Sequence, residues 1–257
     1  MCRFLIASAG LWLAAIASAS TSEPLVICYE DQHFPPYILG TSGQVAGHGG
    51  IIYDYIEQSA ALLEHPVVFE RKPWKRCQVE LQHGDVDAMF ATIYTEERDA
   101  WAAFPKTDGV PDDRYLHFAT YPVFVPMGSE LSWNGEAFSP AKPLVQSVPG
   151  YVSEKKLLAM GMRPITALLP REALPLVATG RLEGYVLEEQ LGRELARQMG
   201  LEDNITTLPI PFLEQPWYLA FSKQRYAQDP ELVETFWTIL KEVRETLGPS
   251  IIKRYTE

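Results

Sequence analysis

The chain has 257 residues, 47% of them hydrophobic, which is enough for one large domain or for two lobes of about 100 residues each. Its 22 basic and 33 acidic residues give a formal net charge of −11, and the sequence contains no basic patch. Nucleic acid and anionic membranes are therefore excluded as expected partners.

The N-terminus has the pattern of a secretion signal. An apolar run from Phe4 to Ile16 follows Arg3, and the small residues Ala17-Ser18-Ala19 form a cleavage site. The run is too short for a permanent membrane span, and no later segment is apolar enough for one. We expect residues 1–19 to be a signal peptide and the mature protein to be periplasmic.

The mature chain keeps two cysteines, Cys28 and Cys77, an even number in an oxidising compartment. Cys28 lies in the first expected strand, and Cys77 lies in the first turns of a helix expected to pack near it. A disulfide and two separately buried thiols both fit this pattern.

The first part of the chain alternates strands and helices. We expect strands at 25–29, 67–69 and 86–93, and helices at 51–63 and 74–83. Gly84 is a typical residue for the end of the second helix. The β-α-β-α-β order predicts a parallel sheet with helices on both faces.

The segment that follows Gly84 is the first candidate for a binding site. A buried parallel strand releases its chain at the carboxyl edge of the sheet, where α/β folds hold their ligands. Thr92, Thr95 and Arg98 reach this edge. The segment therefore predicts one half of a ligand clamp.

A similar pattern recurs 96 residues later, from Gly180 to Glu188. Both segments have the same order of residue types: a glycine, a charged residue, an aliphatic residue, an acid, a small residue and then large apolar residues. This similarity predicts two similarly wound lobes, in which Glu188 is the counterpart of Thr92. Around the second copy we expect strands at 115–120, 123–125, 144–148 and 165–169, helices at 154–160 and 171–179, and an irregular surface segment at 99–118.

The C-terminal part returns to the first lobe. Residues 208–212 are expected to connect the lobes, 217–221 to form a strand, and Asp229-Pro230 to begin a long scaffold helix. We predict that residues 20–119 and 212–257 form lobe 1 and that residues 120–211 form lobe 2.

Four motifs in this order resemble those of a known family. They are Phe34-Pro35-Pro36-Tyr37, Gly84-x-Val86-Asp87-Ala88, Thr95-Glu96-Glu97-Arg98, and the segment 217–223 that begins with Trp217. With them the chain resembles a divergent member of the extracellular solute-binding protein family 3, the periplasmic amino-acid-binding components of ABC transporters. The resemblance covers nearly all of the mature chain. It implies an α/β, two-lobed periplasmic-binding-protein type II fold with a ligand cleft between the lobes.

The resemblance also implies roles for four residues. Arg98 would bind the ligand α-carboxylate, for which a guanidinium fork is well suited, or else form a salt bridge. Glu188 would accept the ligand ammonium group, or else only stabilise a helix N-terminus. Phe34 and Trp74 would enclose the ligand side chain, although Trp74 could equally belong to the core.

The chain departs from the family pattern at two points. Where the family often has a serine, this chain has Ile93, with Thr92 as its neighbour. The turn into the second-lobe helix, which in the family is an anion-binding nest, reads Gly150-Tyr151-Val152-Ser153 here, with Ser153 as the expected helix cap. Thr92, Tyr151 and Ser153 are therefore further candidate ligand contacts.

The resemblance favours a monomeric, non-catalytic receptor. It would close on an amino acid or small carboxylate by hinge motion and deliver it to the membrane permease of an ABC importer. We expect no cofactor or metal. The alternatives are a ligand-sensing module and a cyclic-acid dehydratase on the same fold, in which Glu188, His33 or Asp31 could act as acid or base. The sequence contains no nucleophile elbow, zinc motif or phosphate loop.

Overall fold

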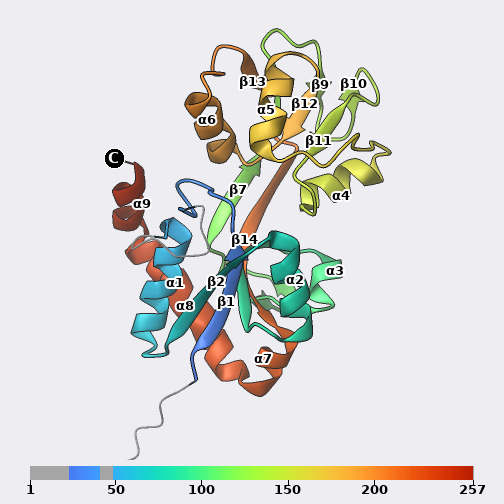
Figure 1. Ribbon diagram of the computed structural model, residues 1–257. Helices are drawn as coiled ribbons and strands as arrows, with labels where there is room; N and C mark the ends of the chain where they lie inside the picture. Colours follow the sequence, from blue (N-terminus) through green and yellow to red (C-terminus); the bar gives the residue numbers. More distant parts are fainter. Residues whose placement is uncertain (1–22, 41–48, 257) are drawn as a thin grey trace, which may run out of the picture.

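A computed structural model describes residues 23–40 and 49–256, so the predicted signal peptide lies outside the described residues. Figure 1 shows two α/β lobes, one above the other. Two long strands, β7 (His117–Tyr121) and β14 (Leu213–Ser222), run side by side between the lobes as an antiparallel pair. These strands are the crossing segments expected of a two-lobed fold.

The sheet of the lower lobe has six strands. Its order is β2-β1-β3-β14-β4, and β7 also pairs with β14. Strand β1 is parallel to β2 and β3, which confirms the expected parallel arrangement, whereas β14 runs antiparallel to β3. The other strands of this sheet are β1 (Leu25–Glu30), β2 (Val67–Lys72), β3 (Ala88–Ile93) and β4 (Ala102–Ala103).

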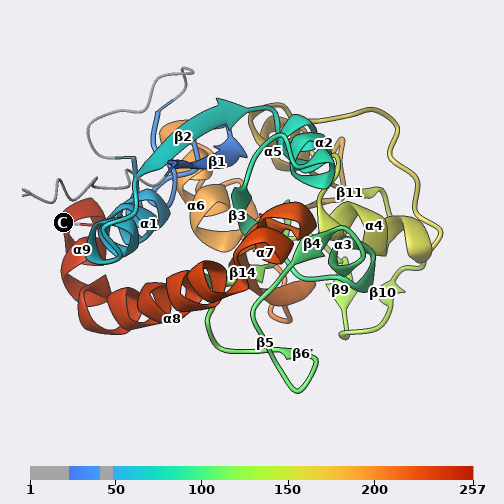
Figure 2. The same ribbon diagram turned by 90° about the horizontal axis from the view of Figure 1, so that it is seen from below.

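Helices cover both faces of this sheet. Helices α1 and α8 lie against one face, and α2 and α3 lie on the other (Figures 1 and 2). The helices of this lobe are α1 (Ile51–Leu62), α2 (Trp74–His83), α3 (Glu96–Asp99), α7 (Lys223–Gln228), α8 (Pro230–Thr246) and α9 (Gly248–Thr256); the short hairpin β5 (Lys106–Thr107) and β6 (Val110–Pro111) lies beside them.

Because helices cover both faces of this sheet, the central strands do not alternate between apolar and polar residues. Tyr29 and Phe90 belong to one buried cluster, whereas their chain neighbours Cys28 and Met89 belong to another. Because successive side chains of a strand point to opposite faces, a strand covered on both sides needs apolar residues at every position.

A disulfide joins the sheet to α2. Cys28 in β1 and Cys77 in α2 are bonded, with their Cα atoms 5.6 Å apart. This confirms the disulfide rather than two free thiols.

The upper lobe is built on a four-stranded sheet with the order β11-β12-β8-β13. Its strands are β8 (Val123–Pro126), β11 (Val145–Ser147), β12 (Gly184–Val186) and β13 (Ile205–Thr207), accompanied by the hairpin β9 (Ser132–Trp133) and β10 (Phe138–Ser139). Its helices are α4 (Val152–Ala159), α5 (Pro170–Ala178) and α6 (Glu189–Gln198).

The glycine that begins the repeated pattern adopts the same backbone conformation in both lobes. Gly84 and Gly180 have φ values of 76° and 69°, in the left-handed region that favours glycine. Each follows the end of a helix and precedes an inner strand, β3 or β12. The prediction of two similar helix–glycine–strand junctions is therefore correct.

Three local predictions are wrong. Residues 99–118 are not an irregular surface segment throughout, because β4 pairs with β14 in the sheet and Ala102, Phe104 and Leu116 are buried. Residues 165–169 do not form a strand: Ile165 is 74% exposed, and the positions beside β12 and β8 are taken by β11 and β13. Ser153 is not the cap of α4. The helix begins at Val152, two residues earlier than predicted, with Tyr151 at the N-cap position, and the Ser153 hydroxyl instead bonds Ser147 within the lobe.

Among the described residues, no helix combines the length and apolar character that crossing a membrane requires.

Candidate ligand-binding site

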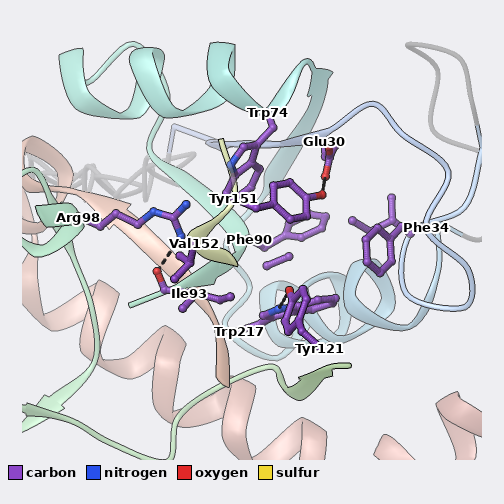
Figure 3. A pocket seen from close by; sticks show the side chains of 12 residues that line it. Glu30, Phe34, Trp74, Phe90, Ile93, Arg98, Tyr121, Tyr151, Val152 and Trp217 are labelled. Carbon is purple, nitrogen blue, oxygen red and sulfur yellow. Dashed lines mark hydrogen bonds between the residues drawn. The ribbon is translucent and has the colours of Figure 1, made fainter. Parts of the chain in front are cut away.

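A small cavity lies where the two lobes meet (Figure 3). From the first part of the chain it is lined by Glu30, Phe34, Ile38, Trp74, Phe90 and Ala91. From later segments it is lined by Ile93, Arg98, Tyr121, Tyr151, Val152 and Trp217. The ends of β1 and β3 open onto it, which is the sheet edge where α/β folds hold ligands. We call it the inner chamber.

The inner chamber is nearly filled by its own side chains. The space open to the centre of a water molecule is about 30 Å³. That volume holds one or two waters, whereas ligand pockets usually measure roughly 300–1,000 Å³. A ligand the size of an amino acid therefore needs side chains or lobes to move apart.

Arg98 supplies the positive charge of the inner chamber. The Thr95 hydroxyl accepts a hydrogen bond from the Arg98 backbone N–H and so caps α3, which fixes the start of the turn that carries Arg98. The guanidinium donates a 2.8 Å hydrogen bond from Nη1 to the carbonyl of Ile93, and it lies 5.6 Å from the centre of the Trp74 ring. Arg98 is only 3% exposed.

No carboxylate pairs with Arg98 in the part of the chain that the structure describes. Burial lowers the pKa of Arg98 to about 10, against smaller opposing effects of Tyr121 and Glu97. A buried guanidinium is costly unless an anion compensates it. The Trp74 indole N–H, on the same wall, is also buried without a described acceptor. Two donors are thus available to a carboxylate.

Glu30 supplies a negative charge at the end of β1. Its Oε2 accepts a 2.5 Å hydrogen bond from the hydroxyl of Tyr151, which comes from the upper lobe (Figure 3). Burial raises the pKa of Glu30 to about 7, although the Tyr151 hydrogen bond lowers it. The inner chamber therefore holds a carboxyl group and a guanidinium from the lower lobe, and a tyrosine from the upper lobe covers the carboxyl group.

Aromatic rings form the remaining walls. Phe34 packs edge-on against Trp217 with ring centres 5.5 Å apart, and Trp74 packs against Tyr151 at 6.1 Å. The indole N–H of Trp217 donates a 2.8 Å hydrogen bond to the hydroxyl of Tyr121, which fixes both rings. Such rigid walls can enclose a ligand at low entropic cost.

A bulge in β3 shapes the floor of the inner chamber. Phe90 and Ala91 together stand opposite a single residue of β14, Leu219, and Ala91 has a positive φ of 58°. The extra residue reverses the alternation, so Ile93 faces the same buried cluster as Phe90. Thr92 consequently does not line the chamber.

Of the seven predicted ligand contacts, the structure gathers four around the inner chamber: Phe34, Trp74, Arg98 and Tyr151. The other three lie outside its lining and are bonded locally. Thr92 is fully buried with its hydroxyl directed to the carbonyl of Met89, and Ser153 bonds Ser147. All three residues stay predicted ligand contacts, but none of them is among the residues that line the inner chamber.

Glu188 is the third of these residues. Its carboxylate accepts a 2.9 Å hydrogen bond from the backbone N–H of Leu191 and so caps α6, which matches the alternative of a helix N-terminal glutamate. It is 2% exposed, and burial raises its pKa to about 7. Arg98 and Glu188 are not brought together around the inner chamber.

Sequence reasoning missed Glu30, Tyr121 and Trp217 as site residues. Glu30 had a usable signal, because it ends the first parallel strand at the same sheet edge as the β3 loop. Tyr121 and Trp217 had none beyond their place in the crossing strands, since their contact depends on how β7 and β14 pair.

A cavity between two α/β lobes joined by crossing strands is the site of a periplasmic-binding-protein type II fold, and solved structures confirm this fold. A histidine kinase sensor domain with similarity to periplasmic binding proteins matches with a TM-score of 0.72 and 18% identity, covering 92% of this chain and 97% of that one. The ligand-binding core of GluR0 from Nostoc punctiforme, in complex with L-glutamate, matches with a TM-score of 0.69 and 13% identity, covering 91% and 99%.

The arginine-, lysine-, histidine-binding protein ArtJ from Geobacillus stearothermophilus matches with a TM-score of 0.69 and 16% identity, covering 91% of this chain and 95% of that one. No protein-family model matches the sequence, and no curated protein does either. The likeness to solved structures is one of fold.

Proposed function

We propose that the protein is a divergent extracellular solute-binding protein that captures a small solute carrying a carboxylate. The observation that carries this proposal is Arg98, a guanidinium that is 3% exposed, lines the interlobe cavity and has no carboxylate partner among the described residues. A ligand carboxylate would supply the missing charge and accept hydrogen bonds in a planar fork.

Glu30 supports a zwitterionic ligand, such as an amino acid. If Tyr151 moves away, the part-buried carboxylate of Glu30 loses its hydrogen-bond partner, and a cationic group of the ligand would compensate that loss. Glu30 therefore takes the ammonium-binding role in this proposal. Neighbours of the same fold include the core of GluR0 in complex with L-glutamate and the arginine-, lysine-, histidine-binding ArtJ.

Ligand entry in this proposal requires the lobes to open. The strands β7 and β14 are the connections that would bend, and closure would then bury the solute between the lobes. By analogy with amino acid ABC transporter substrate-binding proteins of this fold, we propose that the closed monomer delivers its solute to a membrane permease from the periplasm. The proposed lobes are residues 20–119 with 212–257, and residues 120–211.

The test is thermal unfolding of the mature protein with a panel of L-amino acids and small carboxylates. A binding compound at 100 times its Kd should stabilise the protein by about 2.7 kcal/mol. The same compound should not stabilise the variant Arg98→Met. No shift with any compound would overturn the proposal, and an equal shift in Arg98→Met would remove Arg98 from the site.

A second candidate is a ligand-sensing module, which the likeness to a histidine kinase sensor domain favours. The two candidates share the ligand site and differ in what the closed form contacts. Ligand-dependent uptake into vesicles that contain the cognate permease supports delivery, whereas ligand binding without uptake supports sensing.

A further inference from the structure

A second, larger cavity adjoins the inner chamber. We call it the outer chamber. It borders Glu30, Phe34 and Tyr151, three residues that also line the inner chamber. Its volume open to the centre of a water molecule is about 370 Å³, against about 30 Å³ for the inner chamber. Of the two chambers, only the outer one is within the usual size range of ligand pockets.

Tyr151 forms the partition between the two chambers. Its ring stands beside Trp74 on the inner side, and its hydroxyl is bonded to Glu30, which belongs to both linings. Figure 3 shows the Tyr151 ring between Trp74 and Glu30. The hydrogen bond to Glu30 and the ring contact with Trp74 are the contacts that hold this partition in place.

The outer chamber has an apolar wall from the upper lobe. Leu191 and Leu195 on α6 lie beside it, together with Val148 and Leu169. The polar residues at its rim each form a hydrogen bond within the chain, and Gln32 donates to Asp31. Arg171 donates to Gln198, Glu172 accepts from the backbone N–H of Leu169, and Nδ1 of His33 accepts from the backbone N–H of Gly40. The uncommitted surface of the chamber is therefore mainly hydrocarbon.

We propose that the outer chamber is a second subsite, which takes an apolar side chain of a ligand whose charged head is bound in the inner chamber. Arg98 and Glu30 hold the head, Tyr151 moves to let the ligand pass between the chambers, and the leucine wall accepts the tail. The ligand class is thus α-amino acids with long aliphatic or aromatic side chains. This proposal rests on the proposed function and adds the ligand specificity of the same site.

Leu169 allows a clean test because it lines the outer chamber and is 43% exposed, so a larger side chain can enter without displacing core residues. The variant Leu169→Trp should partly fill the chamber. Its matched control is Leu158→Trp, since Leu158 is also 43% exposed, lies on α4 of the same lobe and lines neither chamber. Melting temperatures without ligand show whether both variants are folded.

The probes are L-alanine, L-norvaline, L-norleucine and L-phenylalanine, titrated calorimetrically. In the wild type each added methylene should tighten binding about fourfold, as expected for burial of one CH₂ group. Leu169→Trp should weaken L-norleucine and L-phenylalanine at least tenfold and change L-alanine less than twofold, whereas Leu158→Trp should match the wild type.

The outcomes separate this subsite from the proposed function. Equal affinities for L-alanine and L-norleucine, or an unchanged chain-length dependence in Leu169→Trp, would overturn the subsite and leave the amino-acid receptor standing. Tighter binding of L-arginine than of L-norleucine would overturn the apolar class of ligand. A wild type that binds none of these probes nor any compound of the wider panel would overturn both.

Discussion

The hydroxyl of Tyr151 and the carboxylate of Glu30 join the two lobes through a 2.5 Å hydrogen bond between residues 121 positions apart in the sequence. A second contact between the lobes, Lys155 with Glu97, joins exposed side chains and contributes at most about 1 kcal/mol. The part-buried Tyr151–Glu30 contact lies on the candidate site itself. The proposed ligand site and one of the contacts that hold the lobes together therefore share these two side chains.

The first prediction concerns the effect of pH on Glu30. Its pKa is about 7 in the folded protein and near 4.5 when unfolded, because burial disfavours the charged form. The stability that it contributes is fully present below pH 4.5 and is lost as the pH rises to about 7. The wild type should therefore lose about 2 kcal/mol between pH 5 and pH 8 relative to the variant Glu30→Gln.

Urea unfolding of both proteins at pH 5 and pH 8 measures this difference. The comparison isolates Glu30, because Glu188, whose pKa is also about 7, and His117, whose pKa burial lowers to about 4, titrate in both proteins. A difference in unfolding free energy that does not change with pH would show that Glu30 titrates normally. The variant should also bind a zwitterionic ligand more weakly.

The second prediction concerns Arg98 and stability without ligand. The variant Arg98→Met loses a hydrogen bond to Ile93, which costs about 1–3 kcal/mol, but it also removes an uncompensated buried charge. We expect the two effects to offset one another to within about 1 kcal/mol, while carboxylate binding falls at least a hundredfold. A loss of several kcal/mol in urea unfolding would instead assign Arg98 to the scaffold.

The third prediction concerns the disulfide. Its cysteines are 49 residues apart, and closing a loop of that size stabilises a fold by about 2–4 kcal/mol. Reduction with dithiothreitol should lower the unfolding free energy by that amount. Cys77 is also on the same helix as Trp74, one turn away, so the reduced protein should bind its ligand more weakly. The variant with alanine at both positions should not respond to dithiothreitol, which controls for other effects of the reductant.

Most of the fold and four of the residues that line the inner chamber could be predicted from the sequence, because the signals were local. Gly84 and Gly180 marked the helix ends, and the Thr95–Arg98 turn followed a buried strand. The remainder depends on tertiary structure. The bulge at Ala91 turns Thr92 away from the inner chamber, and it forms only where β3 pairs with β14.

The contact between Tyr151 and Glu30 could not be predicted for a different reason. It depends on how the two lobes approach one another, which neither the β1 segment nor the α4 segment encodes alone. The hydrogen bond of Ser153 also depends on tertiary structure and could not be predicted from the local sequence. A serine near a helix start is a typical cap, but here its hydroxyl is taken by Ser147 of the neighbouring strand β11.

The fourth prediction separates the two roles of Glu188. Its carboxylate caps α6, and a serine in its place can still accept the same hydrogen bond from the backbone. The variant Glu188→Ser should therefore keep ligand affinity within about threefold if capping is its whole role, and Glu188→Ala should lose about 1 kcal/mol of stability without losing affinity. A hundredfold loss of amino-acid affinity in Glu188→Ser, with the fold intact by circular dichroism, would instead make Glu188 the acceptor of the ligand ammonium group. Glu30 would then be free to bind the ligand side chain, and Glu30→Gln would change the choice among amino acids rather than the affinity for all of them.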